Sequence, residues 1–459
     1  MVERDDAPPD IEPTAAFEGW HRPGVPQFRA SHSLLARLHT QLRSRHPALL
    51  AELAAAGVAP CAIDLVLPSN QIAGHTPRTD DGELQHLLGR RATFEYVLRR
   101  HVGALPNVRF VHGARVDGLA IAREGEQLRV RGLSYVRGDQ HEALEADIVV
   151  DASGGRSSTA AWLRAQGAAI DEEAQPSDFA YFCRHYRLRD GGKEPFRKRT
   201  GAILDYLWFG AFFAEHGHFS LALACPNEEP ELVQTMRHAE GFDAIGRSMP
   251  GVEELLARAE PTSKVIGAGG LTNRWTRHVD RRGPAALGFF AVGDAHVQTN
   301  PMYGRGCSAA FVQAAALAAT LRDEADPVAR GKRFAAAVHE ELRPQYEFCV
   351  NAEQLFQGRG LRARGLPAPR SLQAADYFTD QIWAPSVLES RFIARESVKT
   401  MQMQAVAPFW TRIGLLLCMV LLWLRRGFRK APLVPERTGP AREELLAKLR
   451  GRGERSAAE

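Results

Sequence analysis

Residues 288–321 read GFFAVGDAHVQTNPMYGRGCSAAFVQAAALAATL, which predicts a strand, a loop and a helix in succession. The apolar run 289–292 is typical of a strand buried inside an α/β protein. Gly293 and Asp294 end that run. A carboxylate at the end of a strand can accept hydrogen bonds from the hydroxyl groups of a ligand. The stretch therefore indicates a binding site as well as a fold.

The loop after Asp294 contains Pro301, Gly304 and Gly306, and an alanine-rich helix is predicted from Cys307 to Leu321. Glycines allow backbone N–H groups to face a ligand, and the N-terminus of a helix favours negative or electron-rich groups. An ordinary strand–loop–helix crossover of an α/β protein is the alternative interpretation. The joint occurrence of the Gly-Asp pair, the proline, two glycines and the alanine helix favours a ligand site.

A second region, residues 91–158, predicts a helix followed by several strands. TFEYVLRRHVGAL (93–105) has apolar residues at helical spacing, whereas NVRFVHGARVDGLAI (107–121) and LRVRGLSYV (128–136) are typical of strands. In EADIVVDASGGRSS (145–158), the run 148–150 predicts a strand covered on both faces, and the small residues 151–155 predict a sharp turn. An ordinary strand-to-loop transition would give the same pattern.

Residues 288–321 resemble the second flavin-binding motif of FAD-dependent monooxygenases and oxidoreductases, relatives of squalene epoxidase, geranylgeranyl reductase and flavin-dependent halogenases. The resemblance implies that Gly293-Asp294 binds the ribityl chain of FAD. It also implies that the P-x-x-G-x-G loop of Pro301, Gly304 and Gly306 approaches the isoalloxazine ring. The resemblance extends from residue 1 to about residue 325 and is most specific at this loop.

Other segments match the same family in the same order. Glu3 in MVERD is similar to the acidic residue that binds the adenosine ribose. GVPQFRASH resembles a loop that would place Gln27 and His32 near the flavin, and Arg91 resembles the arginine at the start of a helix that approaches the cofactor. ADIVVDASG (146–154) resembles the small-residue turn after a late strand of the FAD domain.

The family opens with a strand, a G-x-G-x-x-G turn and a helix, and no such motif occurs here in that context. We therefore expect that about 30 residues of the nucleotide-binding unit are missing before Met1. Either the start of the chain is placed too late, which the position of Val2-Glu3 favours, or the chain is a truncated protein that binds FAD badly.

The predicted fold class is α/β (α+β). It combines a Rossmann-like FAD-binding domain truncated at its N-terminus, an inserted antiparallel-sheet substrate domain and a helical C-terminal region. The predicted boundaries are 1–165 for the first part of the FAD domain, 166–280 for the substrate domain, 281–325 for the second part of the FAD domain and 326–459 for the helical region. The alternating aromatic segments FAYFCRHYRL, AILDYLWFGAFF and HFSLALACP supply the antiparallel sheet, with one apolar and one more polar face.

The residues that would contact substrate or flavin are His296 and Asn300 in the loop, together with Tyr181, Arg184, Trp208 and Phe212 on the sheet. Most aromatic residues of such a sheet are plain core, and a loop histidine exposed to water is the alternative for His296. No catalytic acid or base is predicted, because in flavin chemistry the cofactor carries the reaction. Halogenation is disfavoured, since the chain has no W-x-W-x-I-P stretch and no lysine before Lys193.

Composition limits the partners. The net charge is +4 and the charges of both signs are interspersed, so no nucleic-acid partner is expected. The six cysteines are far apart, which favours neither a metal site nor disulfides and is typical of a reducing, cytoplasmic compartment. The N-terminus has no apolar run of a secretory signal.

Residues 405–430 contain a 12-residue apolar run, 413–424, followed by Arg425, Arg426, Arg429 and Lys430. This run is shorter than the roughly 20 residues needed to span a bilayer. A buried packing helix is one interpretation, and peripheral contact with the inner face of a membrane is the other.

The sequence thus predicts an FAD-dependent oxidoreductase, a monooxygenase that uses reduced flavin and O2 on a hydrophobic small molecule, with NAD(P)H as a possible electron donor. The alternatives are a non-catalytic or impaired flavoprotein remnant and a flavin-dependent reductase of isoprenoid substrates.

Overall fold

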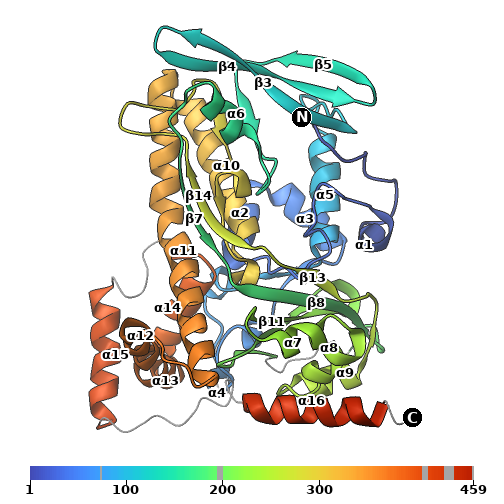
Figure 1. Ribbon diagram of the computed structural model, residues 1–459, viewed down its shortest axis with the longest axis vertical. Helices are drawn as coiled ribbons and strands as arrows, with labels where there is room; N and C mark the ends of the chain where they lie inside the picture. Colours follow the sequence, from blue (N-terminus) through green and yellow to red (C-terminus); the bar gives the residue numbers. More distant parts are fainter. Residues whose placement is uncertain (73–74, 194–199, 406–411, 428–438, 457–459) are drawn as a thin grey trace.

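The computed structural model describes residues 1–72, 75–193, 200–405, 412–427 and 439–456 (Figure 1). Its largest sheet has six strands, all paired antiparallel, in the order β12-β8-β11-β10-β9, with β13 also paired to β8. This confirms the antiparallel sheet predicted from the aromatic segments. The strands are β8 (Phe179–Leu188), β9 (Gly201–Ile203), β10 (Trp208–Phe213), β11 (His218–Pro226), β12 (Ala259–Pro261) and β13 (Ile266–Ala268).

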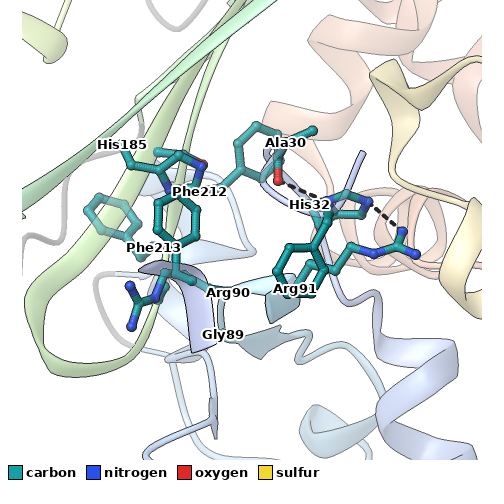
Figure 2. Close-up of a pocket in the computed structure, with 12 residues that line it drawn as sticks. Ala30, His32, Gly89, Arg90, Arg91, His185, Phe212 and Phe213 are labelled. Carbon is teal, nitrogen blue, oxygen red and sulfur yellow. Dashed lines mark hydrogen bonds between the residues drawn. The ribbon is translucent and has the colours of Figure 1, made fainter. Parts of the chain in front are cut away.

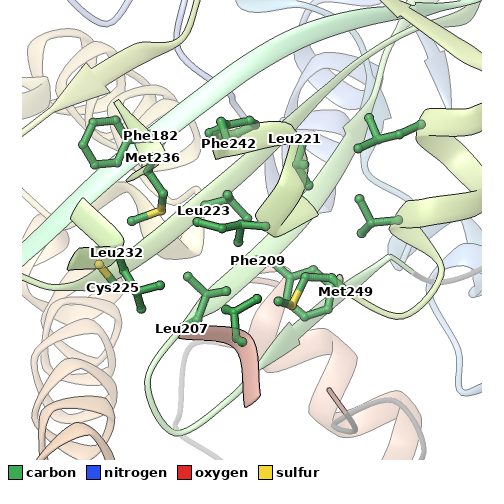
Figure 3. Close-up of a cluster of buried hydrophobic side chains, with 14 of the residues drawn as sticks. Phe182, Leu207, Phe209, Leu221, Leu223, Cys225, Leu232, Met236, Phe242 and Met249 are labelled. Carbon is green, nitrogen blue, oxygen red and sulfur yellow. The ribbon is translucent and has the colours of Figure 1, made fainter. Parts of the chain in front are cut away.

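Both faces of this sheet are buried, and the second face also holds the polar side chains of His185 and Ser220. One face packs under the short helices α7 (Pro230–Met236), α8 (Ala239–Gly246) and α9 (Val252–Ala257). Side chains that alternate along the strands, such as Leu221 and Leu223, point into this core (Figure 3). The side chains between them, Ala222 and Ala224, pack on the opposite face with Met302 and Phe356. The sheet is therefore a middle layer between helices and the 300–306 loop.

The strand before the Gly-Asp pair, β15 (Phe289–Ala291), pairs in parallel with β6 (Val149–Asp151). Ala291 lies opposite Asp151, so the two turns predicted from sequence meet at the same carboxyl edge. The strand 148–150 was predicted to be covered on both faces, but Val150 is 42% exposed. That part of the prediction is wrong. Val2 forms an isolated parallel bridge with Val111.

Two smaller antiparallel sheets complete the strands. β3 (Ala114–Glu124), β4 (Gln127–Arg137) and β5 (Gln140–Glu145) form a meander, seen at the top of Figure 1. β7 (Asp171–Pro176), β14 (Thr272–Arg277) and β16 (Val297–Gln298) form the other sheet and connect the Gly-Asp region to the large sheet. A short two-stranded pair joins β1 (Ala59–Pro60) to β2 (Leu87–Leu88).

The N-terminal half has α1 (Ala16–Gly19), α2 (Ala36–Arg45), α3 (Pro47–Ala55), α4 (Ser69–Ile72), α5 (Arg91–Gly103) and α6 (Thr159–Ala165). The alanine helix α10 (Gly306–Asp323) packs beside the long helix α11 (Pro327–Ala363) (Figure 1). Its small side chains permit this close approach. The helices predicted from sequence at 93–105 and 307–321 are thus confirmed.

The C-terminal region is helical, as predicted. It contains α12 (Arg370–Tyr377), α13 (Ala384–Glu389), α14 (Arg391–Met401), α15 (Ile413–Arg425) and α16 (Arg442–Ser456). Helix α16 returns to the large sheet, where Leu445 and Leu446 join the core beneath α7–α9. Residues 406–411 and 428–430 of the predicted membrane-contact segment lie outside the described residues. In the part of the chain that the structure describes, no helix is both long enough and apolar enough to cross a membrane.

Candidate flavin site

The Gly-Asp pair forms a tight turn at the end of β15. Gly293 has a φ of 63°, a left-handed conformation that a glycine adopts without strain, and η5 (Gly293–Ala295) follows. Burial raises the pKa of Asp294, although Arg91 and Arg274 lie close enough to oppose that rise. Among the described residues, no hydrogen bond or ion pair to the Asp294 carboxylate is found. A half-buried carboxylate without a protein partner is available to the donors of a ligand.

The loop after this turn places a helix N-terminus beside Asp294. Gly304 has a φ of 63°, and a Cβ atom there would lie 2.8 Å from the Cβ atom of Ser33. Helix α10 then begins at Gly306, whose Cβ position is 3.9 Å from Asp294 Oδ1. No side chain caps α10, and its first turn contains no acidic residue. Its positive end is therefore open to an electron-rich group.

The N-terminal half contributes a histidine–arginine pair, His32 and Arg91 (Figure 2). His32 Nδ1 donates to the carbonyl of Ala30 over 2.9 Å, so Nε2 carries the lone pair that accepts from Arg91 Nη1 at 3.0 Å. Burial, together with the charge of Arg91, lowers the pKa of His32 to about 3. The imidazole is therefore neutral at physiological pH. Arg91 also lies near Asp294 and Cys307.

A chain of ion pairs extends from Arg91 to the N-terminus. Arg91 Nε binds Glu95 Oε2 at 3.3 Å, and Arg22 bridges Glu95 to Glu3, whose Oε2 lies 3.1 Å from Arg22 Nη2. Arg99 Nη1 contacts the same Glu3 oxygen at 3.1 Å. These ion pairs connect Glu3, which was predicted to bind the ribose, with Arg91, which was predicted to approach the flavin. Two arginines already hold the Glu3 carboxylate in this structure. The contact between Glu3 and the ribose stays a prediction.

A narrow pocket lies between the loop around His32, the start of α5 and strands β8, β10 and β11 (Figure 2). The space between its side chains has room for about one water molecule. A substrate could enter only if the aromatic side chains moved. The lining residues are Phe17, Phe28, Ala30, His32, Gly89, Arg90, Arg91, His185, Phe212, Phe213, Ala214 and Ser220.

His185 is a pocket residue that the sequence reasoning missed. Its Nε2 atom pairs with the carbonyl of Arg29 at 2.8 Å and therefore carries the proton, while Nδ1 is buried without a partner among the described residues. Burial lowers its pKa to about 4. The signal was present, because His185 follows Tyr181 and Cys183 at a spacing of two along β8 and so shares their face.

The structure separates the substrate-contact residues predicted on the sheet. Tyr181, Trp208 and Phe212 lie on the face that packs against the 300–306 loop, and Phe212 also lines the pocket. Arg184 lies on the opposite face, where its Nη1 pairs with Asp243 of α8 at 2.8 Å. Arg184 is therefore remote from the pocket.

Gln27 was predicted to lie near the flavin. Its backbone carbonyl belongs to the turn before His32, where it accepts from the N–H of Ala30 at 3.0 Å.

The two loop residues predicted to contact substrate point into the protein. His296 is 7% exposed and packs against Trp275, His278 and Phe334, so the water-exposed alternative is wrong. Asn300 is buried, and its backbone N–H and its side-chain amide are paired. Its backbone N–H donates to Asn273, its Nδ2 donates to Ser177 and Glu353, and its Oδ1 accepts from Met302 N–H. Asn300 thus fixes the shape of the loop.

These features fit the flavin and ribityl portion of FAD. They comprise a carboxylate without a protein partner, a left-handed glycine with no room for a Cβ atom and an uncapped helix N-terminus. Ribityl hydroxyls can donate to Asp294, and the electron-rich edge of a flavin ring is stabilised by the positive end of α10. Among the described residues, no group of histidine, cysteine and carboxylate side chains could hold a metal ion.

Comparison with known proteins supports the fold. No model of a known protein family matches the chain. Protein Rv3254 of Mycobacterium tuberculosis is 28% identical over 319 residues, an alignment that covers 66% of this chain and 65% of that protein's own length. The chain thus matches slightly less than two thirds of this curated relative.

Solved structures share the fold over most of their length. The flavin-dependent brominase Bmp2 aligns with a TM-score of 0.56 and 16% identity over 88% of this chain and 91% of its own. PqsL of Pseudomonas aeruginosa, a probable FAD-dependent monooxygenase, aligns with a TM-score of 0.54 and 18% identity over 79% and 90%. The myxobacterial chondrochloren halogenase CndH gives 0.54 and 17% over 88% and 90%. The predicted flavoprotein hydroxylase-like fold is confirmed. Because halogenases and monooxygenases share it, the fold alone selects no reaction.

Proposed function

We propose that this protein is an FAD-dependent oxidoreductase, and more specifically a monooxygenase acting on a hydrophobic small molecule. The observation that carries the proposal is the Asp294 carboxylate, which has no partner among the described residues and lies beside the uncapped N-terminus of α10 and near Arg91. The shared fold of flavin-dependent enzymes supports it.

When bound, FAD would supply electron transfer and the activation of O2. The protein's part is to bind and orient. Asp294 would accept hydrogen bonds from the ribityl chain, and the first turn of α10 would stabilise negative charge on the flavin. Arg91, held by His32 and Glu95, would be available to bind the flavin. The phenylalanines of the pocket leave room for about one water molecule in this region.

The proposal requires no histidine acid. His32 and His185 have pKa values lowered to about 3 and about 4 by burial, so both imidazoles stay neutral near pH 7. A neutral His185 Nδ1 can accept a hydrogen bond from a substrate hydroxyl or N–H group that reaches the pocket. NAD(P)H as the electron donor is part of the proposal.

Titration of the protein with FAD, followed by quenching of flavin fluorescence, tests the binding site. Replacing Asp294 by Ala removes charge-assisted hydrogen bonds of about 1.5–3 kcal/mol, so the affinity should fall roughly 10- to 100-fold. The matched control is Asp323→Ala at the far end of α10, where the carboxylate is exposed and paired with Arg322. Equal affinities of the two variants would remove Asp294 from the site.

A second experiment tests the reaction class. NADH or NADPH is added to the FAD-loaded protein in air, and consumption of the nucleotide and formation of hydrogen peroxide are followed. Peroxide formation supports an oxygen-using flavoenzyme. Flavin that binds normally but transfers no electrons to O2, even after chemical reduction, would favour the non-catalytic or the reductase alternative.

A further inference from the structure

Helix α15 exposes a continuous apolar stripe. Its inner face packs against the helices beside it, where Leu415 and Met419 are buried with Ile393 of α14. Its outer face carries five large apolar residues at spacings of three, four and one, which places them on one side of the helix. Their exposed fractions are Ile413 73%, Leu417 57%, Val420 36%, Leu421 59% and Leu424 45%.

This outer face is unusual for the molecule. Thirteen large apolar side chains are exposed among the described residues, and five of them lie on these 13 residues of α15. Scattered exposed apolar side chains are normal in soluble proteins, but a contiguous stripe marks an interaction site. Helix α15 lies at the outer edge of the molecule, with α12 and α13 on its inner side (Figure 1).

The charges on α15 indicate which partner the stripe fits. The helix contains no acidic residue. Arg412 and Arg426 at its ends are paired with Glu396 and Glu389, but Arg425 is exposed next to the apolar stripe. An apolar surface with an exposed cation at its edge, and with no carboxylate on the helix itself, is complementary to an anionic lipid surface.

The length of the helix fixes its orientation. Thirteen residues of α-helix extend about 20 Å, whereas the hydrocarbon core of a bilayer is about 30 Å thick. We propose that α15 docks flat on an anionic bilayer, with Ile413, Leu417, Leu421 and Leu424 entering the boundary between headgroups and acyl chains. Arg425 then contacts lipid phosphate. This docking surface is independent of the flavin site.

Sedimentation with vesicles tests the proposal. The probes are vesicles of phosphatidylcholine alone and of phosphatidylcholine mixed with phosphatidylglycerol. Wild-type protein should bind the mixed vesicles more tightly, and high salt should weaken that binding. Leu417→Ser combined with Leu421→Ser should lower the partition coefficient at least about tenfold. The matched control is Leu105→Ser with Leu144→Ser, which changes two leucines of 42% and 45% exposure elsewhere on the surface and should bind like wild type.

Cys418 provides a second readout on the folded wild-type chain. It is the exposed cysteine of the six, and it lies on the outer face next to Leu417. An environment-sensitive fluorophore attached there should shift to the blue on adding mixed vesicles. Wild-type protein that neither sediments nor shifts at low salt would overturn the proposal. So would analytical ultracentrifugation in which wild type forms a dimer and the Leu417/Leu421 variant is a monomer, because the stripe would then bind a second copy.

Discussion

At the scale of single residues, the candidate flavin site depends on positions where a side chain is either free or forbidden. In the described part of the chain the Asp294 carboxylate has no partner, and Gly304 cannot carry a Cβ atom without meeting Ser33. Asp294 must carry a free side chain and Gly304 must carry none, but both residues belong to the candidate flavin site. Asp294 supplies an acceptor, and Gly304 lets the loop before α10 pack closely against Ser33.

Gly304→Ala should weaken both folding and flavin binding. At a φ of 63°, an alanine costs about 1–2 kcal/mol from its own backbone, and the contact of 2.8 Å with Ser33 adds to this cost. Urea unfolding and FAD titration measure the two effects. The control is Gly269→Ala, where a Cβ atom would meet nothing within 4 Å. Wild-type behaviour of Gly304→Ala would show that the loop need not hold this conformation.

The sequence indicates site residues best where chemistry and backbone conformation coincide. Gly293, Asp294 and Gly304 could be assigned to a candidate site because a carboxylate after a strand and glycines before a helix are typical of ligand binding, and their contact with FAD stays a prediction. His296 and Asn300 could not be placed, because whether a loop side chain points inward depends on distant partners such as Trp275 and Glu353. No local pattern contains that information.

At the scale of elements, α16 is bound to a core far from it in sequence. Leu445 and Leu446 are 0% and 2% exposed among the side chains beneath α7–α9. Arg442 fixes the start of the helix through Glu229, with Nη2 at 2.8 Å from Oε2. Helix α16 is therefore part of the fold of the large sheet.

Leu445→Ala should destabilise the protein by about 2–5 kcal/mol, since it leaves a cavity in that core. Lys448→Ala, on the exposed side of the same helix, should change the free energy of unfolding by less than about 0.5 kcal/mol. Urea unfolding followed by tryptophan fluorescence measures both. If Leu445→Ala were as stable as Lys448→Ala, α16 would not pack on the sheet in solution.

Helices and strands were predicted well where a periodic pattern of apolar residues extends over many positions. The helices α5, α10 and α15 and the strands β8, β10 and β11 lie close to their predicted positions. Burial was predicted less well. Val150 is exposed although its strand was predicted to be covered on both faces, because burial is decided by which elements pack together and not by the pattern of one strand.

At the scale of the whole molecule, buried neutral histidines should make stability depend on pH. His185 and His296 have pKa values lowered by burial to about 4 and about 3 from 6.5. Below pH 6.5 the unfolded chain binds protons at these residues, whereas the folded chain does not. Stability is therefore lost as the pH falls from about 6.5 toward 4, at up to about 1.4 kcal/mol per pH unit for each histidine.

Urea midpoints measured from pH 7 to pH 4.5 test this dependence. His296→Gln should lose its share of the slope and flatten the curve. The control is His141→Gln, whose side chain is 77% exposed and which should keep the wild-type slope. A curve for His296→Gln parallel to that of wild type would mean that His296 is protonated in the folded protein.

The overall fold could be predicted from the sequence because the resemblance at residues 288–321 fixes the topology around it. The ion-pair chain from Arg91 to Glu3 could not, since it joins residues up to 96 positions apart through arginines that no motif distinguishes. A single sequence does not distinguish charged residues that form a chain of ion pairs from charged residues on the surface.

The most direct test of the account is a crystal structure of the protein grown with FAD. The account predicts the flavin at the N-terminus of α10, with a ribityl hydroxyl within about 3 Å of the Asp294 carboxylate and Arg91 beside the ring. FAD bound elsewhere, or bound with Asp294 and the first turn of α10 in contact with water alone, would contradict it.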